Sequence, residues 1–161
     1  MIVSDILAAL EAGRFPLVLT ERTKHLEFLA EQLHKSVKDV FVLKGGLGKK
    51  ALVEVYTQLR ALPEKVGRIV LATGKFVGEG FDDPRLDTLF LTLPISWKGT
   101  LQQYAGRLHR LCEGKQNVKI YDYVDKEVMV LERMYRKRLK GYMGLGYQVI
   151  DDSQTFPFHR I

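Results

Sequence analysis

Short apolar runs recur along this chain, and most of them lack the polar alternation of a half-buried strand. They are PLVLT (16–20), VFVLK (40–44), RIVLAT (68–73), DTLFLTL (87–93) and the more mixed VKIYDYV (118–124). Strands without alternation are buried on both faces, as in a parallel sheet that helices cover. Longer segments with helical apolar spacing separate the runs. The sequence therefore predicts an α/β fold, a parallel sheet with helices on both of its faces.

The helical segments set the expected organisation of the 161 residues, which fit one domain. A leading helix is expected within residues 1–13, with Gly13 placed to end it. Further helices are expected at 22–37, 49–63, 102–110 and 127–142. The core then spans 14–125, and a basic helix and tail span 126–161, where YQVI (147–150) is a candidate edge strand. The basic helix fits either a nucleic-acid-binding patch or a solvated face.

The bulk composition restricts the partners and the compartment. Lys and Arg number 25 against 19 Asp and Glu, and the net charge of +6 favours an anionic partner. The longest apolar runs are far too short to cross a bilayer, so no membrane association is expected. The N-terminus lacks a basic leader, and the lone Cys112 excludes an internal disulfide and fits a reducing compartment. A cytoplasmic protein is expected.

Several kinds of chemistry find no support in the sequence. The stretch GGLGKK (45–50) resembles a phosphate-binding P-loop, but that motif needs glycine in place of Leu43 and Ser or Thr in place of Lys50. The four histidines lack the spacing of a zinc site, so no metal site is expected. Nothing near Cys112 in the sequence supplies a base for its thiol. A small-molecule enzyme on a doubly wound sheet is disfavoured because the dinucleotide fingerprint is missing.

The stretch QQYAGRLHR (102–110) carries the strongest functional signal. In a helix, Gln103, Arg107 and Arg110 fall at i, i+4 and i+7, on one face. Gly106 lies within that face and would let another surface approach closely. Two guanidiniums on one face suit phosphate oxygens through forked hydrogen bonds. Spacing alone leaves two alternatives open, a solvated face and a capping box that uses Gln103.

Three segments in order carry a family resemblance. QYAGRLHR matches Q-x-x-G-R-x-x-R, the sixth motif of superfamily 2 helicases. LATGKFVGEGFDDPRLDTLFL resembles their fifth motif, and PLVLTERTKHLEFLAEQL resembles the strand and helix of the fourth. The resemblance covers roughly residues 14–125. The chain resembles the C-terminal RecA-like domain of a bacterial DEAD/DEAH-type helicase, nearest the DNA-repair and restriction-translocase branch, a P-loop-NTPase-type fold without the P-loop.

The resemblance implies a nucleotide site shared between two domains. In this family ATP and Mg²⁺ lie between two RecA-like domains, and the N-terminal domain carries the P-loop. Arg107 and Arg110 would contact the γ-phosphate, with Arg110 as the arginine finger. Gln103 would touch the γ-phosphate or the acidic motif of the partner domain, and Gly106 would lie at the same site. The isolated chain is therefore expected not to hydrolyse ATP.

The fifth motif implies further contacts with the nucleotide. Gly80 would permit a close backbone approach, and Asp82 would accept a hydrogen bond from the ribose or order the nucleotide-side loop. Glu79 stands where many relatives have arginine, so it is either an ATP-site residue or a solvated loop acid.

A second set of residues is expected to face nucleic acid. The resemblance implies that the hydroxyl of Thr73 donates to a backbone phosphate. Gly45 and Gly46 precede a helix that begins with Lys49, and they either offer N–H groups to an anion or form a tight turn beside solvated lysines. Arg22 is either a similar contact or a surface charge. Contacts of this kind hold a strand without reading its sequence.

Together these features predict the second half of an ATP-dependent DNA helicase or translocase, whose partner is an N-terminal RecA-like domain carrying the P-loop. DNA is the expected nucleic acid. The alternative is a non-catalytic nucleic-acid-binding or protein-docking module that retains the helicase fold. Such a module would be expected to lose the arginines or the glycines of the fifth and sixth motifs, and this sequence keeps them.

Overall fold

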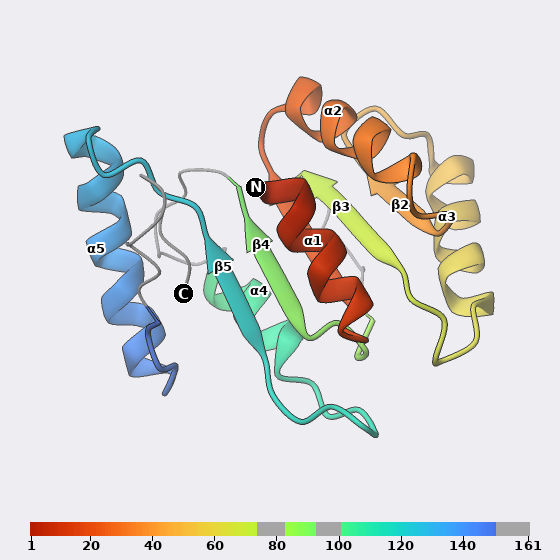
Figure 1. Cartoon of the computed structure of the whole chain (residues 1–161). Helices are drawn as coiled ribbons and strands as arrows, with labels where there is room; N and C mark the ends of the chain where they lie inside the picture. The colour runs from red at the N-terminus through yellow and green to blue at the C-terminus, as the bar shows by residue number, and fades with distance from the viewer. Residues whose placement is uncertain (74–82, 93–100, 151–161) are drawn as a thin grey trace.

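The structure, a computed structural model, describes residues 1–73, 83–92 and 101–150. Within these residues, five parallel strands form one sheet in the order β2-β3-β1-β4-β5 (Figure 1). The strands are β1 (Pro16–Thr20), β2 (Val40–Leu43), β3 (Ile69–Thr73), β4 (Thr88–Leu91) and β5 (Lys119–Asp122). The predicted parallel sheet is confirmed, with β1 at its centre.

Helices cover both faces of the sheet, as the sequence predicts. On one face lie α1 (Ile2–Glu11) and α2 (Thr23–His34); on the other lie α3 (Lys49–Ala61), α4 (Gln102–Leu108) and α5 (Met129–Gly144). In Figure 1, α1 lies in front of the sheet and α4 lies behind it. Within the described part of the chain, no helix has the length and apolarity needed to cross a membrane.

The central strand β1 shows why its sequence lacks polar alternation. Leu17 and Leu19 point into the core shared with α3, α4 and α5, whereas Val18 points into the core shared with α1 and α2. All three side chains are fully buried. Burial of an aliphatic side chain contributes about 1.5–3 kcal/mol relative to its exposure, so neither face of β1 tolerates a polar residue without loss.

The leading helix ends where the sequence predicts. Gly13 adopts a φ of +74°, and its N–H donates to the carbonyl of Leu10 at 2.9 Å. The N–H of Arg14 donates to the carbonyl of Ala9 at 3.0 Å. This paired arrangement requires a left-handed residue, which glycine adopts without a steric penalty.

A buried ion pair fastens α5 to the end of β5. Arg138 donates to the two carboxylate oxygens of Asp122 at 2.7 and 2.8 Å, and the hydroxyl of Tyr142 donates to the same carboxylate at 3.1 Å. Burial raises the pKa of Asp122, opposed by its hydrogen bond and charge interaction with Arg138. One basic residue of the predicted basic helix is therefore structural.

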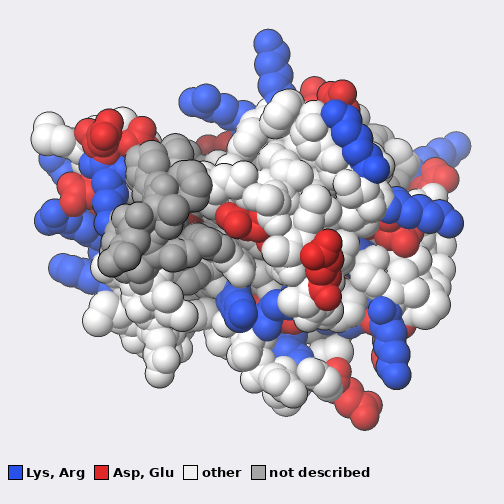
Figure 2. Space-filling view, in the orientation of Figure 1, with Lys and Arg blue, Asp and Glu red and all other residues white. Residues whose placement is uncertain are grey.

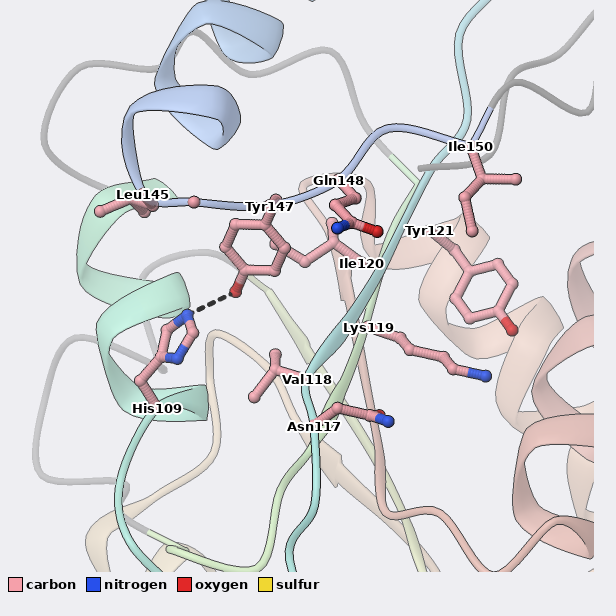
Figure 3. A pocket seen from close by; sticks show the side chains of 11 residues that line it. His109, Asn117, Val118, Lys119, Ile120, Tyr121, Leu145, Tyr147, Gln148 and Ile150 are labelled. Atoms are coloured by element: carbon pink, nitrogen blue, oxygen red, sulfur yellow. Dashed lines mark hydrogen bonds between the residues drawn. The ribbon is translucent and has the colours of Figure 1, made fainter.

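The segment after α5 is not a strand, so the candidate edge strand at 147–150 is wrong. Gly146 adopts a φ of +85°, and the N–H of Tyr147 donates to the carbonyl of Tyr142 at 3.0 Å. The ring of Tyr147 then packs edge-on against the imidazole of His109, with centroids 5.4 Å apart (Figure 3). These contacts hold Tyr147 toward α4 instead of along β5.

Candidate functional site

Two threonines meet at the carboxyl edge of the sheet. Thr20 ends β1 and Thr73 ends β3, and the pairing of the two strands sets them side by side. Thr73 is 9% exposed, and Thr20 is 1% exposed. The hydroxyl of Thr20 accepts the N–H of Arg22 at 3.4 Å, and Arg22 itself is exposed. The structure thus brings Thr73 and Arg22, both predicted to face nucleic acid, to one edge.

His25, in the first turn of α2, contacts the end of β1. Its Nδ1 is 3.2 Å from the hydroxyl oxygen of Thr20, and the residue is partly buried. Burial and, to a lesser degree, the charge of Arg22 lower the pKa of His25. The contact assigns the imidazole to packing at the start of α2.

We expect the pKa of His25 to lie below its ordinary value of 6.5 and to rise in Arg22→Ala, because that variant removes a nearby positive charge. The folded state disfavours the protonated ring, whereas the unfolded chain protonates it near pH 6.5. The free energy of unfolding should therefore fall as the pH is lowered from 6.5 through the folded-state pKa of His25. NMR titration of the imidazole measures the midpoint. Lys24→Ala changes an exposed neighbouring residue and is the control, which should leave the midpoint of His25 unchanged. An equal midpoint in Arg22→Ala and the wild-type chain would contradict the electrostatic contribution of Arg22.

The turn between β2 and α3 brings together Gly45, Gly46 and Lys49, all of them exposed. Gly46 adopts a φ of +87°, a conformation that residues with a side chain rarely adopt. Lys49 begins α3, and no side chain caps the first turn of that helix. Its first N–H groups therefore lack intrahelical partners and carry the positive end of the helix dipole. The turn is open to an anion.

Helix α4 presents the sixth motif, but it is shorter than the sequence predicts. It ends at Leu108, and the N–H of Arg110 donates to the carbonyl of Arg107 at 3.3 Å in a tight turn. Gln103 and Arg107 share a helical face one turn apart, whereas Arg110 lies beyond the helix. The expected i, i+7 relation between Gln103 and Arg110 on one helix is wrong.

One side of α4 packs in the core and the other is open. Tyr104 and Leu108 are buried against the sheet. Gln103 and Gly106 are exposed, and a Cβ built on Gly106 would meet no described atom within 4 Å. The close approach expected at Gly106 is not made by any described residue of this chain.

Arg110 is exposed, but the backbone of the turn that carries it is held by hydrogen bonds from Lys115. The ammonium of Lys115 donates to three carbonyls, those of Pro84 at 2.6 Å, Leu108 at 2.8 Å and Arg110 at 2.9 Å. No motif in the sequence indicates this role for Lys115, because its partners are scattered along the chain.

His109 fastens the same turn to the segment after α5 (Figure 3). Its Nε2 lies 2.8 Å from the hydroxyl oxygen of Tyr147, and burial raises the pKa of Tyr147 to about 12, so the hydroxyl keeps its proton. Both residues line a cavity of about 510 Å³ beside β5. None of the predicted site residues that the structure describes lines that cavity.

The predicted residues fall into two places. Thr73, Arg22 and the Gly45–Gly46 turn lie at the carboxyl edge of the sheet. The end of α4 lies toward the opposite edge, because Lys115 bridges the carbonyl of Arg110 to that of Pro84, which precedes β4.

No family model matches the chain. Transcript termination protein A18 of Fowlpox virus (strain NVSL) is 26% identical over 129 residues, which are 78% of this chain. The chain spans 27% of the length of that relative.

Solved structures share the fold at low identity. UvsW of T4 matches with a TM-score of 0.65 and 13% identity over 89% of this chain and 31% of its own length. The C-terminal part of the Fun30 ATPase domain matches with a TM-score of 0.66 and 16% identity over 84% of this chain and 43% of its own. Helicase Lhr of Mycobacterium smegmatis, in a structure bound to ssDNA and AMP-PNP, matches with a TM-score of 0.61 and 16% identity. The match covers 87% of this chain and 19% of the Lhr chain. The fold is RecA-like, and UvsW and the helicase Lhr share it.

Some predicted contacts of the RecA-like domain lie outside the described residues, namely those of Glu79, Gly80 and Asp82. Among the residues that are described, no group of three or more His, Cys, Asp or Glu side chains is arranged to hold a metal ion.

The basic helix of the RecA-like domain, α5, divides its cations between core and surface. Arg138 is buried against Asp122. Lys and Arg side chains gather on the outer side of α5 in Figure 2; the exposed ones are Arg133, Arg136, Lys137 and Lys140. Arg136 pairs with Glu132 at 2.6 Å. The exposed set fits both the nucleic-acid-binding and the solvated interpretation of this helix.

Proposed function

We propose that this chain is the second RecA-like domain of an ATP-dependent helicase or translocase that acts on nucleic acid, with DNA as the first candidate. The branch that its motifs resemble is that of bacterial DNA-repair and restriction translocases. In the complete protein it faces an N-terminal RecA-like domain that carries the P-loop. The observation that carries the proposal is a RecA-like fold with a sixth motif exposed along α4, in a sequence without a P-loop.

The open side of α4 suits the triphosphate of a nucleotide held by the partner domain. Bound ATP, with Mg²⁺, supplies the phosphoryl group that is transferred to water. Arg107 and Arg110 offer planar guanidinium forks to the γ-phosphate oxygens, and Arg110 stabilises the charge that grows on them in the transition state. Gln103 lies one helical turn from Arg107 and orients toward the same phosphate or the acidic motif of the partner. Gly106, where an added Cβ would meet no described atom within 4 Å, admits the partner surface.

The nucleotide side of the fifth motif belongs to the same proposal. Gly80 would give the backbone close access to the nucleotide, and Asp82 would accept a hydrogen bond from the ribose or order the nucleotide-side loop. Glu79 would be either a nucleotide-site residue or a solvated loop acid.

The carboxyl edge of the sheet suits a phosphate backbone. Arg22, Lys49 and the N–H groups after Gly45 and Gly46 offer positive charge and donors without a base-reading surface. Thr73 adds a hydroxyl at the end of β3. A net charge of +6 favours the same class of partner, and Lhr, which shares the fold, is bound to ssDNA.

We expect the chain to bind single- and double-stranded oligonucleotides of unrelated sequence to similar extents, with affinity that falls steeply as salt rises. Lys49→Ala should weaken binding to every sequence by a similar factor and lower the salt slope by about one. Fluorescence anisotropy at several salt concentrations measures both quantities. Lys65→Ala removes an exposed lysine beyond the other end of α3 and should change neither. Tight binding to one sequence only, or an affinity that does not change with salt concentration, would contradict binding through the phosphate backbone.

A further inference from the structure

The ammonium of Lys115 lies among backbone carbonyls. It donates to the carbonyls of Pro84, Leu108 and Arg110 at 2.6, 2.8 and 2.9 Å. An ammonium has three N–H groups that diverge tetrahedrally, so three carbonyls use all of them. Burial lowers the pKa of Lys115, because it partly removes the ammonium from water. The arrangement is a specific cage and differs from a solvated lysine.

Two of the three carbonyls belong to the end of α4. Leu108 is the last residue of the helix, and Arg110 follows in the tight turn. Carbonyls at a helix end have no intrahelical donor, so Lys115 supplies what the helix cannot. Lys115 therefore helps to hold the backbone of Arg110 in place.

The third carbonyl ties the turn to a fixed part of the molecule. Pro84 lies between Asp83 and Arg85, which form an ion pair with Nε–Oδ1 at 2.7 Å and Nη2–Oδ2 at 2.9 Å. Arg85 also donates to the carbonyl of Leu59, in the last turn of α3, at 3.2 Å and to that of Leu62, just after the helix, at 3.3 Å. Pro84 lies within the stretch of sequence that resembles the fifth motif, so Lys115 joins the fifth-motif segment to the sixth.

We propose that Lys115 is a positioning residue for Arg110. By holding the Arg110 carbonyl to that of Pro84, it fixes the point from which the guanidinium reaches the γ-phosphate. The proposal rests on the proposed function of the chain. A misplacement of about 1 Å at a reacting group lowers a rate by as much as roughly a hundredfold, so the contact affects turnover more than binding.

The first experiment needs no ATP hydrolysis and uses the 161-residue chain. The N–H of Arg110 is bonded within the turn, so its hydrogen exchange reports whether the turn is held. Lys115→Met should speed that exchange at least about tenfold. Lys119→Met, which removes an exposed lysine of β5, is the matched control and should leave it unchanged. Equal exchange in the wild-type and Lys115→Met chains would overturn the cage.

The second experiment uses the complete two-domain protein. Lys115→Met should lower kcat for ATP hydrolysis at least about tenfold, while KM for ATP and nucleic-acid affinity change less than about threefold. Lys115→Arg keeps the charge but offers a planar fork, so it should recover only part of the loss. Full recovery by arginine, or normal kcat in Lys115→Met with fast exchange at Arg110, would overturn the positioning role. No ATP turnover in the wild-type protein would overturn the proposed function and this role together, and the exchange result would still decide whether the cage exists.

Discussion

Replacement of Arg110 by alanine in the complete two-domain protein is expected to lower kcat for ATP hydrolysis at least about a hundredfold. Arg110 is exposed just beyond the end of α4, and Lys115 donates to its backbone carbonyl. Its guanidinium acts mainly on charge that develops in the transition state, so ATP affinity should fall modestly and nucleic-acid affinity little. Steady-state phosphate release at saturating nucleic acid gives kcat and KM separately.

Three further variants make this result specific. Arg110→Lys should recover little, because a point charge does not reproduce a planar fork. Arg107→Ala should impair turnover with a larger share of the loss in ATP binding. Arg60→Ala removes an exposed arginine of α3 and should leave kcat unchanged. A near-normal kcat in Arg110→Ala, with the fold intact, would assign Arg110 to a solvated face and favour a non-catalytic module.

The strands were predictable because a strand that is buried on both faces appears in the sequence as an apolar run without polar alternation. The run PLVLT coincides with β1, since every residue of that strand is buried. Helix ends were predictable where one residue decides them: Gly13 is left-handed, and Pro63 follows the end of α3. The segment 147–150 could not be predicted, because Tyr147 is drawn to His109, a residue 38 positions away.

The site was predictable only where a motif orders residues along one element. Gln103 and Arg107 lie one turn apart on α4, as their spacing requires. The place of Arg110 depends instead on where α4 ends, and Lys115 binds the carbonyls at that end. Lys115 also reaches Pro84, 31 residues away, and no local pattern announces such a contact. Composition likewise counts Arg138 with the surface cations, although it is buried.

Arg138→Ala is expected to lower the free energy of unfolding by about 3–5 kcal/mol. The variant leaves the carboxylate of Asp122, which is 0% exposed, without its paired hydrogen bonds and opposite charge. Burial already raises the pKa of Asp122, and removal of Arg138 raises it further. A raised folded-state pKa means that the protonated carboxyl is the better tolerated form. The loss should therefore be largest at neutral pH and shrink as the pH falls toward the folded-state pKa and below it.

Two other variants show whether the buried pair is the cause. Arg136→Ala removes an arginine of the same helix that is 72% exposed and paired with Glu132, so it should cost less than about 0.5 kcal/mol. The double variant Asp122→Leu with Arg138→Met leaves no buried charge alone and should recover most of the stability. Urea unfolding at neutral pH compares all three with the wild-type chain. A loss in Arg138→Ala as small as that in Arg136→Ala would mean that water reaches Asp122, and that apolar packing alone holds α5 to the sheet.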